Sequence, residues 1–164
     1  MNQSDQTRNK PGRPAIPESY GISKQQSGLL DWHSVERRLI DARNYWLATA
    51  STAGRPHVAP IWGLWFQGDF YFATDPASRK ARNLAENPRA NLHLESGDEV
   101  VIVEGAVSVL PDRQLSAMLN RLYLEKYAVD LAGSPIHHLL PEKVLAWEEA
   151  DFPNTATRWV ISRR

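Results

Sequence analysis

Three β-rich runs between residues 45 and 74 restrict the fold more than any other part of the chain. They are Tyr45–Ser51, His57–Phe66 and Phe70–Thr74, and short turns rich in glycine and proline separate them. Strands joined by such short turns pair antiparallel, so the three runs predict a meander within an all-β sheet or barrel. Pro60, inside the second run, has no N–H to donate, which predicts a bulge or a sheet edge at that position.

The rest of the chain adds strands and helices around this meander. Helices are predicted over roughly 32–43, over 77–86 and from Pro111 onward, where apolar residues recur at helical spacing. Further strands are predicted over 89–95, 99–109, 143–148 and 157–161, with a loop over 128–141. The predicted fold class is therefore mainly β, a barrel of about six to seven antiparallel strands with about three helices outside it.

The composition argues against several classes of function. Nineteen basic and nineteen acidic residues give a net charge of zero, so no overall field attracts nucleic acid or a membrane surface. The absence of cysteine excludes disulfides, thiolate catalysis and cysteine-bound metals. No run is long enough for a membrane span, and the first residues lack the apolar core of a signal peptide. We therefore expect a cytoplasmic protein that binds neither nucleic acid nor membranes.

The N-terminal residues differ in composition from the rest. Residues 1–28 are polar and rich in Pro, Gly, Ser and Gln, which predicts a flexible arm followed by one domain over 29–164. Ile16, Tyr20 and Ile22 leave open that the arm packs against a partner. Six tryptophans supply flat apolar surfaces for a core, a dimer interface or a stacked cofactor.

The residues after the third run have the chemistry of an anion site. The run over 70–74 ends at Asp75-Pro76, and the next helix is predicted to begin near residue 77. The first turn of a helix has free N–H groups. The hydroxyls and cations nearest to this turn belong to Thr74, Ser78, Arg79 and Lys80. A phosphate is the anion that uses all these groups together.

With these residues the chain resembles the pyridoxamine 5′-phosphate oxidase-like family, the FMN-binding split β-barrels, over roughly residues 31–162. The most specific part is Phe72-Ala-Thr-Asp-Pro-Ala-Ser-Arg-Lys-Ala-Arg-Asn-Leu-Ala-Glu-Asn-Pro-Arg89. It is similar to the family's aromatic-x-Thr-Asn-x-x-Ser-Arg-Lys-Ala segment followed by Asn-Pro-Arg. The resemblance implies a split barrel that binds FMN. It also implies that Arg79 and Lys80 hold the flavin phosphate, with Ala73, Thr74 and Ser78 beside the cofactor.

The resemblance implies further cofactor contacts in other parts of the chain. The strand whose backbone lines the flavin ring in the family matches His57-Val58-Ala59-Pro60-Ile61-Trp62. The Gln before the family's Val-Met-Val strand matches Glu99, whose carboxylate can accept a hydrogen bond from a flavin imide N–H but cannot donate one. The family's Trp and Arg near the cofactor match Trp147 and Arg158. Because the family's site forms at a homodimer interface, a homodimer with the cofactor between its subunits is expected.

Departures from the family pattern narrow the expected activity. Trp62 replaces a Lys that binds the substrate phosphate in the true oxidases, and their Arg-x-His pair is absent from residues 148–157. Oxidation of pyridoxamine phosphate is therefore not expected. His57 replaces an Arg on the phosphate side of the cofactor, which keeps a nitrogen donor but makes its charge pH-dependent. The chain more closely resembles the flavin or deazaflavin oxidoreductases, which use FMN or coenzyme F420.

The expected function is thus an FMN-dependent oxidoreductase acting on a small-molecule substrate, with a coenzyme F420-dependent reductase as the alternative. A non-catalytic flavin- or haem-binding protein is an alternative from another class. No side chain has to act as an acid or a base, so no catalytic residue is assigned. His137-His138 lies in the predicted loop without partners at ligand spacing, and no metal is expected.

Overall fold

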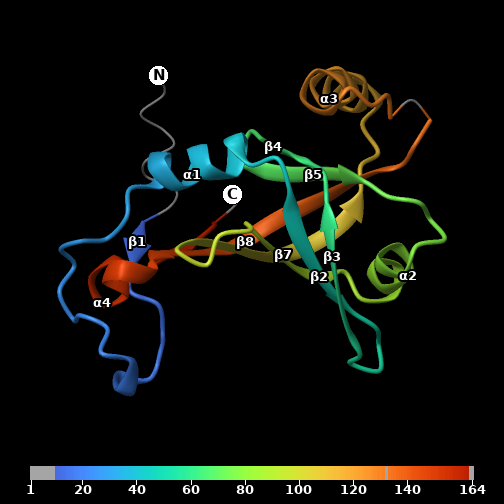
Figure 1. Ribbon diagram of the computed structural model, residues 1–164. Helices are drawn as coiled ribbons and strands as arrows, with labels where there is room; N and C mark the ends of the chain where they lie inside the picture. Colours follow the sequence, from blue (N-terminus) through green and yellow to red (C-terminus); the bar gives the residue numbers. More distant parts are fainter. Residues whose placement is uncertain (1–9, 132, 163–164) are drawn as a thin grey trace.

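An antiparallel sheet of nine strands forms the centre of the protein (Figure 1). The computed structural model describes residues 10–131 and 133–162. The strands are β1 (Pro11–Gly12), β2 (Tyr45–Ala50), β3 (Pro56–Ile61), β4 (Leu64–Phe66), β5 (Asp69–Ala73), β6 (Arg89–His93), β7 (Glu99–Val109), β8 (Ile136–Glu148) and β9 (Thr157–Val160). Seven strands follow the order β1-β9-β8-β7-β6-β2-β3, while β4 pairs with β5 and β5 also pairs with β8.

The long strand β8 divides this sheet. One side of β8 pairs with β7 along almost its whole length. The other side is shared, because residues 136–139 pair with β5 and residues 143–146 pair with β9. The register of β7 shifts at Glu104/Gly105, where a side chain in place of Gly105 would collide with the backbone of Leu140. This bulge bends the β7–β8 pair and helps the sheet to curl into a barrel.

Four α-helices lie outside the strands: α1 (Trp32–Asp41), α2 (Arg79–Glu86), α3 (Arg113–Tyr127) and the short α4 (Phe152–Thr155). Two 3₁₀ turns, η1 (Glu18–Tyr20) and η2 (Glu149–Asp151), complete the described elements. The three longer helices begin where the sequence predicts. Asp31, Ser78 and Asp112 each cap a helix by accepting hydrogen bonds from N–H groups of its first turn.

Two apolar clusters hold the elements together. The larger one lies inside the barrel and joins Val35 and Leu39 of α1 and Leu84 of α2 to the inner faces of the strands, with Trp159 fully buried among them. The smaller one lies between β4, β5 and α3 and is built around Leu64, Leu119, Tyr123 and Tyr127. Burial of these side chains is the main stabilising contribution to the fold.

The predicted fold class is confirmed, and the predicted meander is confirmed in part, because the first run pairs antiparallel with the second and the second with the third. The run over 57–66 forms two strands, which are interrupted at Trp62-Gly63. Gly63 packs against the ring of Phe70 at this interruption, where a side chain would collide with that ring. The strand β3 therefore stays beside β2 at an edge of the sheet, whereas β5 pairs with β4 and β8. The sheet edge predicted at Pro60 is confirmed. The split run and the two-residue β1 raise the strand number to nine.

The predicted loop over 128–141 is also partly wrong. Strand β8 already begins at Ile136, so His137 and His138 lie within a strand. Pairing with β5 and β7 on both sides of this segment outweighs the local turn signals of Gly133 and Pro135.

The described part of the N-terminal arm contacts the end of the chain. Strand β1 pairs with β9, and the guanidinium of Arg13 donates hydrogen bonds to the carbonyl oxygens of Gln25, Ser27, Asn154 and Ala156 at 2.6–3.0 Å. Residues 1–9 of the predicted arm lie outside the described residues, and its flexibility stays a prediction. None of the helices in the described part of the chain has the length and apolar character needed to cross a membrane.

Candidate cofactor site

The junction between β5 and α2 is a tightly hydrogen-bonded turn. The Asp75 carboxylate accepts from the N–H of Ala77 at 2.7 Å, and the Asp75 carbonyl accepts from the N–H of Ser78 at 2.9 Å. Ser78 Oγ then caps α2 by accepting from the N–H of Ala81 at 3.2 Å, and it lies 3.1 Å from Thr74 Oγ1. The two hydroxyls predicted to lie close together therefore do so, at the first turn of the helix.

The first turn of α2 is rich in unpaired donors. Ser78 satisfies the N–H groups of Ala81 and Arg82, whereas the N–H groups of Arg79 and Lys80 lie too near the start of the helix to have an intrahelical acceptor. Within residues 10–131 and 133–162 neither the Arg79 guanidinium nor the Lys80 ammonium forms an ion pair. Helix dipole, free N–H groups and two cations all favour an anion at this point.

A buried hydrogen bond sets α2 against the edge of the sheet. Asn83 Nδ2 donates to Thr49 Oγ1 of β2 at 3.0 Å, and both residues are buried. Thr49 lies directly opposite His57 of β3, and directly opposite residues point to the same face. His57 is thus on the face of the sheet that α2 covers. Neither Asn83 nor Thr49 was predicted as a site residue, although a polar residue on the buried side of the helix, between Ala81 and Leu84, was a usable signal.

The predicted ring-binding strand is an exposed edge. Strand β3 pairs with β2 on one side only, so alternate backbone groups on its other side have no ladder partner among the described strands. Its side chains alternate: Val58 and Pro60 are exposed, His57 and Ala59 are half-buried, and Ile61 is buried. Trp62 follows the strand and is partly exposed. One end of this edge lies beside α2, and the other end lies at Trp62.

The other predicted site residues lie at the opposite end of the molecule. Ala73 pairs with Ile136 at the start of β8, whereas Trp147 lies eleven residues further along the same strand. At about 3.3 Å per residue this separation is roughly 36 Å along the strand. Figure 1 correspondingly shows α2 and α4 at opposite ends of the sheet. One chain therefore does not bring Trp147, Arg158 and Glu99 to the donors of α2.

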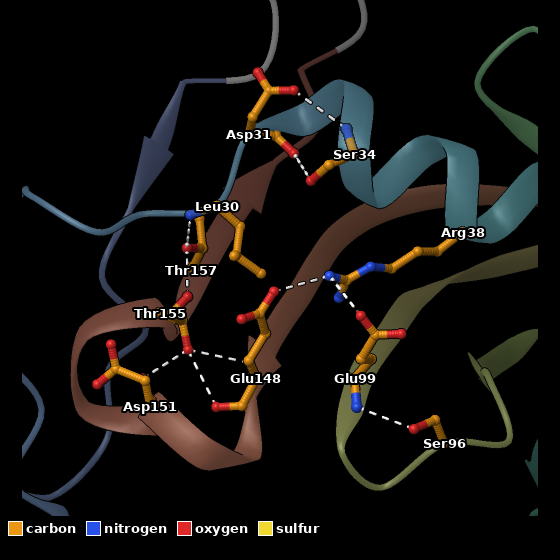
Figure 2. A network of polar contacts seen from close by, with 10 residues as sticks. All are labelled: Leu30, Asp31, Ser34, Arg38, Ser96, Glu99, Glu148, Asp151, Thr155 and Thr157. Atoms are coloured by element: carbon orange, nitrogen blue, oxygen red, sulfur yellow. Dashed lines mark hydrogen bonds and ion pairs between the residues drawn. The ribbon is translucent and has the colours of Figure 1, made fainter.

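Glu99 is held on the inner side by a residue that the sequence analysis missed. Arg38 Nη2 of α1 lies 3.1 Å from Glu99 Oε1 and 2.9 Å from Glu148 Oε1 (Figure 2). The two glutamates are directly opposite each other on β7 and β8, and like charges in such a pair are destabilising. Arg38 offsets this repulsion, so the Glu99 carboxylate is turned toward α1 with one oxygen engaged.

Trp147 and Arg158 point to the outer side of the sheet. Trp147 lies on the face opposite to its buried neighbour Ala146, and its ring contacts Phe152 edge-on at 5.6 Å. Arg158 is opposite Leu145 of β8 and Gly12 of β1, and its Nε is buried with no hydrogen-bond partner in the described part of the chain. Outer-facing Trp147 and Arg158 are therefore separated from inner-facing Glu99.

The two adjacent histidines point apart, as residues of a strand do. His138 Nε2 lies 2.8 Å from Asp69 Oδ2, and its ring stacks on Tyr71. His137 stacks on Phe72, and burial lowers its pKa. Among residues 10–131 and 133–162 no three side chains of the His, Cys, Asp and Glu types gather into a group that could hold a metal ion.

The sequence of this chain is similar to that of known proteins. The family model described as pyridoxamine 5′-phosphate oxidase matches residues 33–150. A pyridoxine/pyridoxamine 5′-phosphate oxidase of Anaeromyxobacter dehalogenans (strain 2CP-C) is 46% identical over 82 residues, which are 47% of this chain and 40% of that protein. The chain thus spans less than half the length of this curated relative.

Solved structures share the fold at low identity. The conserved hypothetical protein Rv2991 of Mycobacterium tuberculosis has a TM-score of 0.66 at 19% identity, over 77% of this chain and 90% of its own. The heme storage protein HutZ of Vibrio cholerae has a TM-score of 0.57 at 18% identity, over 67% and 87%. An F420 reductase has a TM-score of 0.53 at 23% identity, over 66% and 94%.

Proposed function

The chain belongs to the pyridoxamine 5′-phosphate oxidase family, and from this premise we propose that it is a flavin-dependent oxidoreductase that uses FMN. The observation that carries the proposal is the first turn of α2, where Arg79 and Lys80 have no ion-pair partner in the described part of the chain. Unpaired cations beside a capped helix start are a donor set suited to a phosphate monoester.

The residues of α2 would bind the phosphate of FMN, and those of β3 would bind its ring. The phosphate would be held by Arg79, Lys80 and the free N–H groups of the helix, with the hydroxyls of Thr74 and Ser78 beside it. His57 would approach the same end, because the Asn83–Thr49 hydrogen bond fixes α2 against β2, and Thr49 is directly opposite His57 of β3. The ring would lie along the unpaired edge of β3 between His57 and Trp62. When bound, the flavin supplies hydride or electron transfer, and the protein supplies position and shields the ring from water.

We do not assign pyridoxamine phosphate as the substrate. The side chain at position 62 is an indole, and its Nε1–H donates to Asn44 Oδ1 at 3.2 Å. An indole has no charge with which to bind a phosphate and no second donor. The end of β3 is therefore suited to a substrate other than a vitamin phosphate.

A homodimer would complete the site. One row of half-buried or exposed side chains crosses the outer face of the sheet from β3 to β9: Pro60, Trp46, His93, Ile102, Leu145 and Arg158. A second copy packed on this face, about a two-fold axis parallel to the strands, would set β3 of one subunit against β8 and β9 of the other. Trp147 and Arg158 would then approach a flavin bound by the partner's β3 and α2. Residues that lie far apart in one chain would meet in this way.

A coenzyme F420-dependent reductase is the second candidate, favoured by the likeness in fold to an F420 reductase. A non-catalytic haem binder is the third, because the fold is also that of a heme storage protein. The experiment is a titration of the purified full chain with FMN, coenzyme F420 and haemin, followed by a nicotinamide reductant. We expect FMN to bind and to be bleached by the reductant. Binding of F420 or haemin without any binding of FMN would contradict the proposal.

A further inference from the structure

Trp62 is partly exposed and yet fixed in place. It keeps 38% of its surface exposed at the end of β3. One face of its indole stacks on Tyr127, with ring centroids 4.9 Å apart and an interplanar angle of 10°. The Nε1–H donates to Asn44 Oδ1 at 3.2 Å, which prevents the indole from rotating in its plane. Since Tyr127 covers one face, the exposed area belongs to the other face and to the ring edges.

The backbone beneath this ring is held as firmly as the ring itself. The Tyr127 hydroxyl accepts from the N–H of Gly63 at 3.1 Å and lies 2.8 Å from the carbonyl oxygen of Gly63 and 2.7 Å from that of Arg43. Lys126 Nζ donates to the Gly63 carbonyl at 3.4 Å and to Ile40 and Tyr45 oxygens at 3.2 and 3.1 Å. An exposed aromatic surface that is already ordered loses little entropy when a ligand binds to it.

A cation lies beside the exposed surface of Trp62. The Arg43 guanidinium carbon lies 5.5 Å from the ring centroids of both Trp62 and Tyr127, and Arg43 forms no ion pair in residues 10–131 and 133–162. Burial lowers the pKa of Lys126 to about 8, while Asp41 opposes and Arg43 adds to this shift. A second carboxylate, Glu95, accepts a hydrogen bond at 3.3 Å from Nδ2 of Asn44, the residue that also binds the Trp62 indole. Arg43 and Lys126 are therefore accompanied by two carboxylates at this end of β3, and the Arg43 guanidinium is the cation that lies beside the ring of Trp62.

We propose that Trp62 and Arg43 form a binding site for a planar aromatic anion. The free face of the indole offers stacking to a flat ring, and the Arg43 guanidinium offers a partner to a carboxylate on that ring. The inference rests on the proposed function in one respect. If the flavin ring lies along residues 57–62, a ligand on Trp62 is at the substrate side, and the substrate class is an aromatic acid.

The test measures binding of two probe anions to the full chain, with and without FMN, by calorimetry. The probes are 1-naphthoate, which is planar and aromatic, and cyclohexanecarboxylate, which carries the same charge on a saturated ring. We expect naphthoate to bind about tenfold more tightly, since aromatic contacts discriminate by about this factor. With FMN bound, naphthoate should also perturb the flavin absorbance, and cyclohexanecarboxylate should not.

Variants of the two residues make the test specific. Trp62→Leu should remove the preference for naphthoate, and Trp62→Phe should retain most of it. Arg43→Gln should weaken both anions severalfold while leaving the preference unchanged. The matched controls are Tyr20→Leu, which removes an exposed ring far from β3, and Arg37→Gln, which removes an exposed cation on α1 that has no ion-pair partner in the described part of the chain.

The outcomes separate this inference from the proposed function. Naphthoate affinity equal to that of cyclohexanecarboxylate, or unchanged in Trp62→Leu, overturns the site even if FMN binds. The site is also overturned if the wild type binds no naphthoate and the Trp62→Leu variant no longer forms a dimer, because Trp62 would then belong to a subunit interface. Selective binding of naphthoate by a chain that binds no flavin would support the site and contradict the proposed function.

Discussion

The hydrogen bond between Asn83 and Thr49 should be a main determinant of where α2 lies on the sheet. Both side chains are more than nine-tenths buried and joined at 3.0 Å. Replacing Asn83 by Leu leaves the Thr49 hydroxyl buried without a partner, which costs about 2 kcal/mol of unfolding free energy. Thr49→Val should cost about as much, because it leaves the Asn83 amide unsatisfied. The double variant replaces both partners with apolar groups of similar shape, so its cost should be far below the sum of about 4 kcal/mol.

Urea unfolding of the wild type and these three variants measures this coupling. We expect a coupling free energy of about 2 kcal/mol, with Asn91→Leu as a control within about 0.5 kcal/mol of the wild type because Asn91 is exposed. FMN affinity should fall with the single variants and recover in the double variant if the contact sets the spacing between β3 and α2. Additive costs in the cycle would refute the idea that this hydrogen bond positions the helix.

Three further predictions test other parts of the structure. Gly63→Ala would place a Cβ 2.8 Å from a backbone oxygen of β5, and should lower the unfolding free energy by about 2 kcal/mol. The control is Gly97→Ala, which should be neutral because no atom lies within 4 Å of the added Cβ. Equal unfolding free energies of the two variants would contradict the close packing at Gly63. The pKa of Lys126, lowered to about 8 in the folded state, means that the unfolded chain binds more protons above pH 8. Between pH 7 and 9.5 the unfolding free energy of the wild type should therefore rise relative to that of Lys126→Met, by about 1 kcal/mol after discounting for the exposure of Lys126. A fall over this range would contradict a lowered pKa for Lys126. Arg13→Ala removes the bonds that hold residues 25 and 27, so tryptic cleavage after Lys24 should accelerate severalfold; an unchanged rate would show that Arg13 does not fasten the arm.

Local signals in the sequence were sufficient for much of the fold. The apolar spacing predicted three helices close to their observed bounds, and the structure adds the caps Asp31, Ser78 and Asp112 at their starts. The strands over 89–93 and 99–109 were equally accessible, because their alternating apolar residues and flanking turns are short-range features. The grouping of Thr74 and Ser78 at one helix start also followed from spacing alone.

Contacts between distant residues were not accessible in this way. The separation of β3 from β5 depends on the packing of Gly63 against Phe70 and on pairing of β5 with β8, which lies more than sixty residues later in the chain. Arg38 and Glu99 are likewise brought together only when α1 covers the end of the β7–β8 pair. Side-chain partners of this kind are set by tertiary packing, and local propensity carries no information about them.

The central claim is that α2 holds the phosphate of a flavin, and one comparison of affinities tests it most directly. FMN and riboflavin differ by the phosphate alone, so the ratio of their dissociation constants reports what the phosphate contributes. We expect the wild type to prefer FMN by about 100-fold, as two charge-assisted hydrogen bonds imply. Arg79→Ala with Lys80→Ala should abolish this preference, and Arg113→Ala with Arg121→Ala, which removes the same charge from α3, should retain it. An unchanged ratio in the α2 variant would contradict the claim.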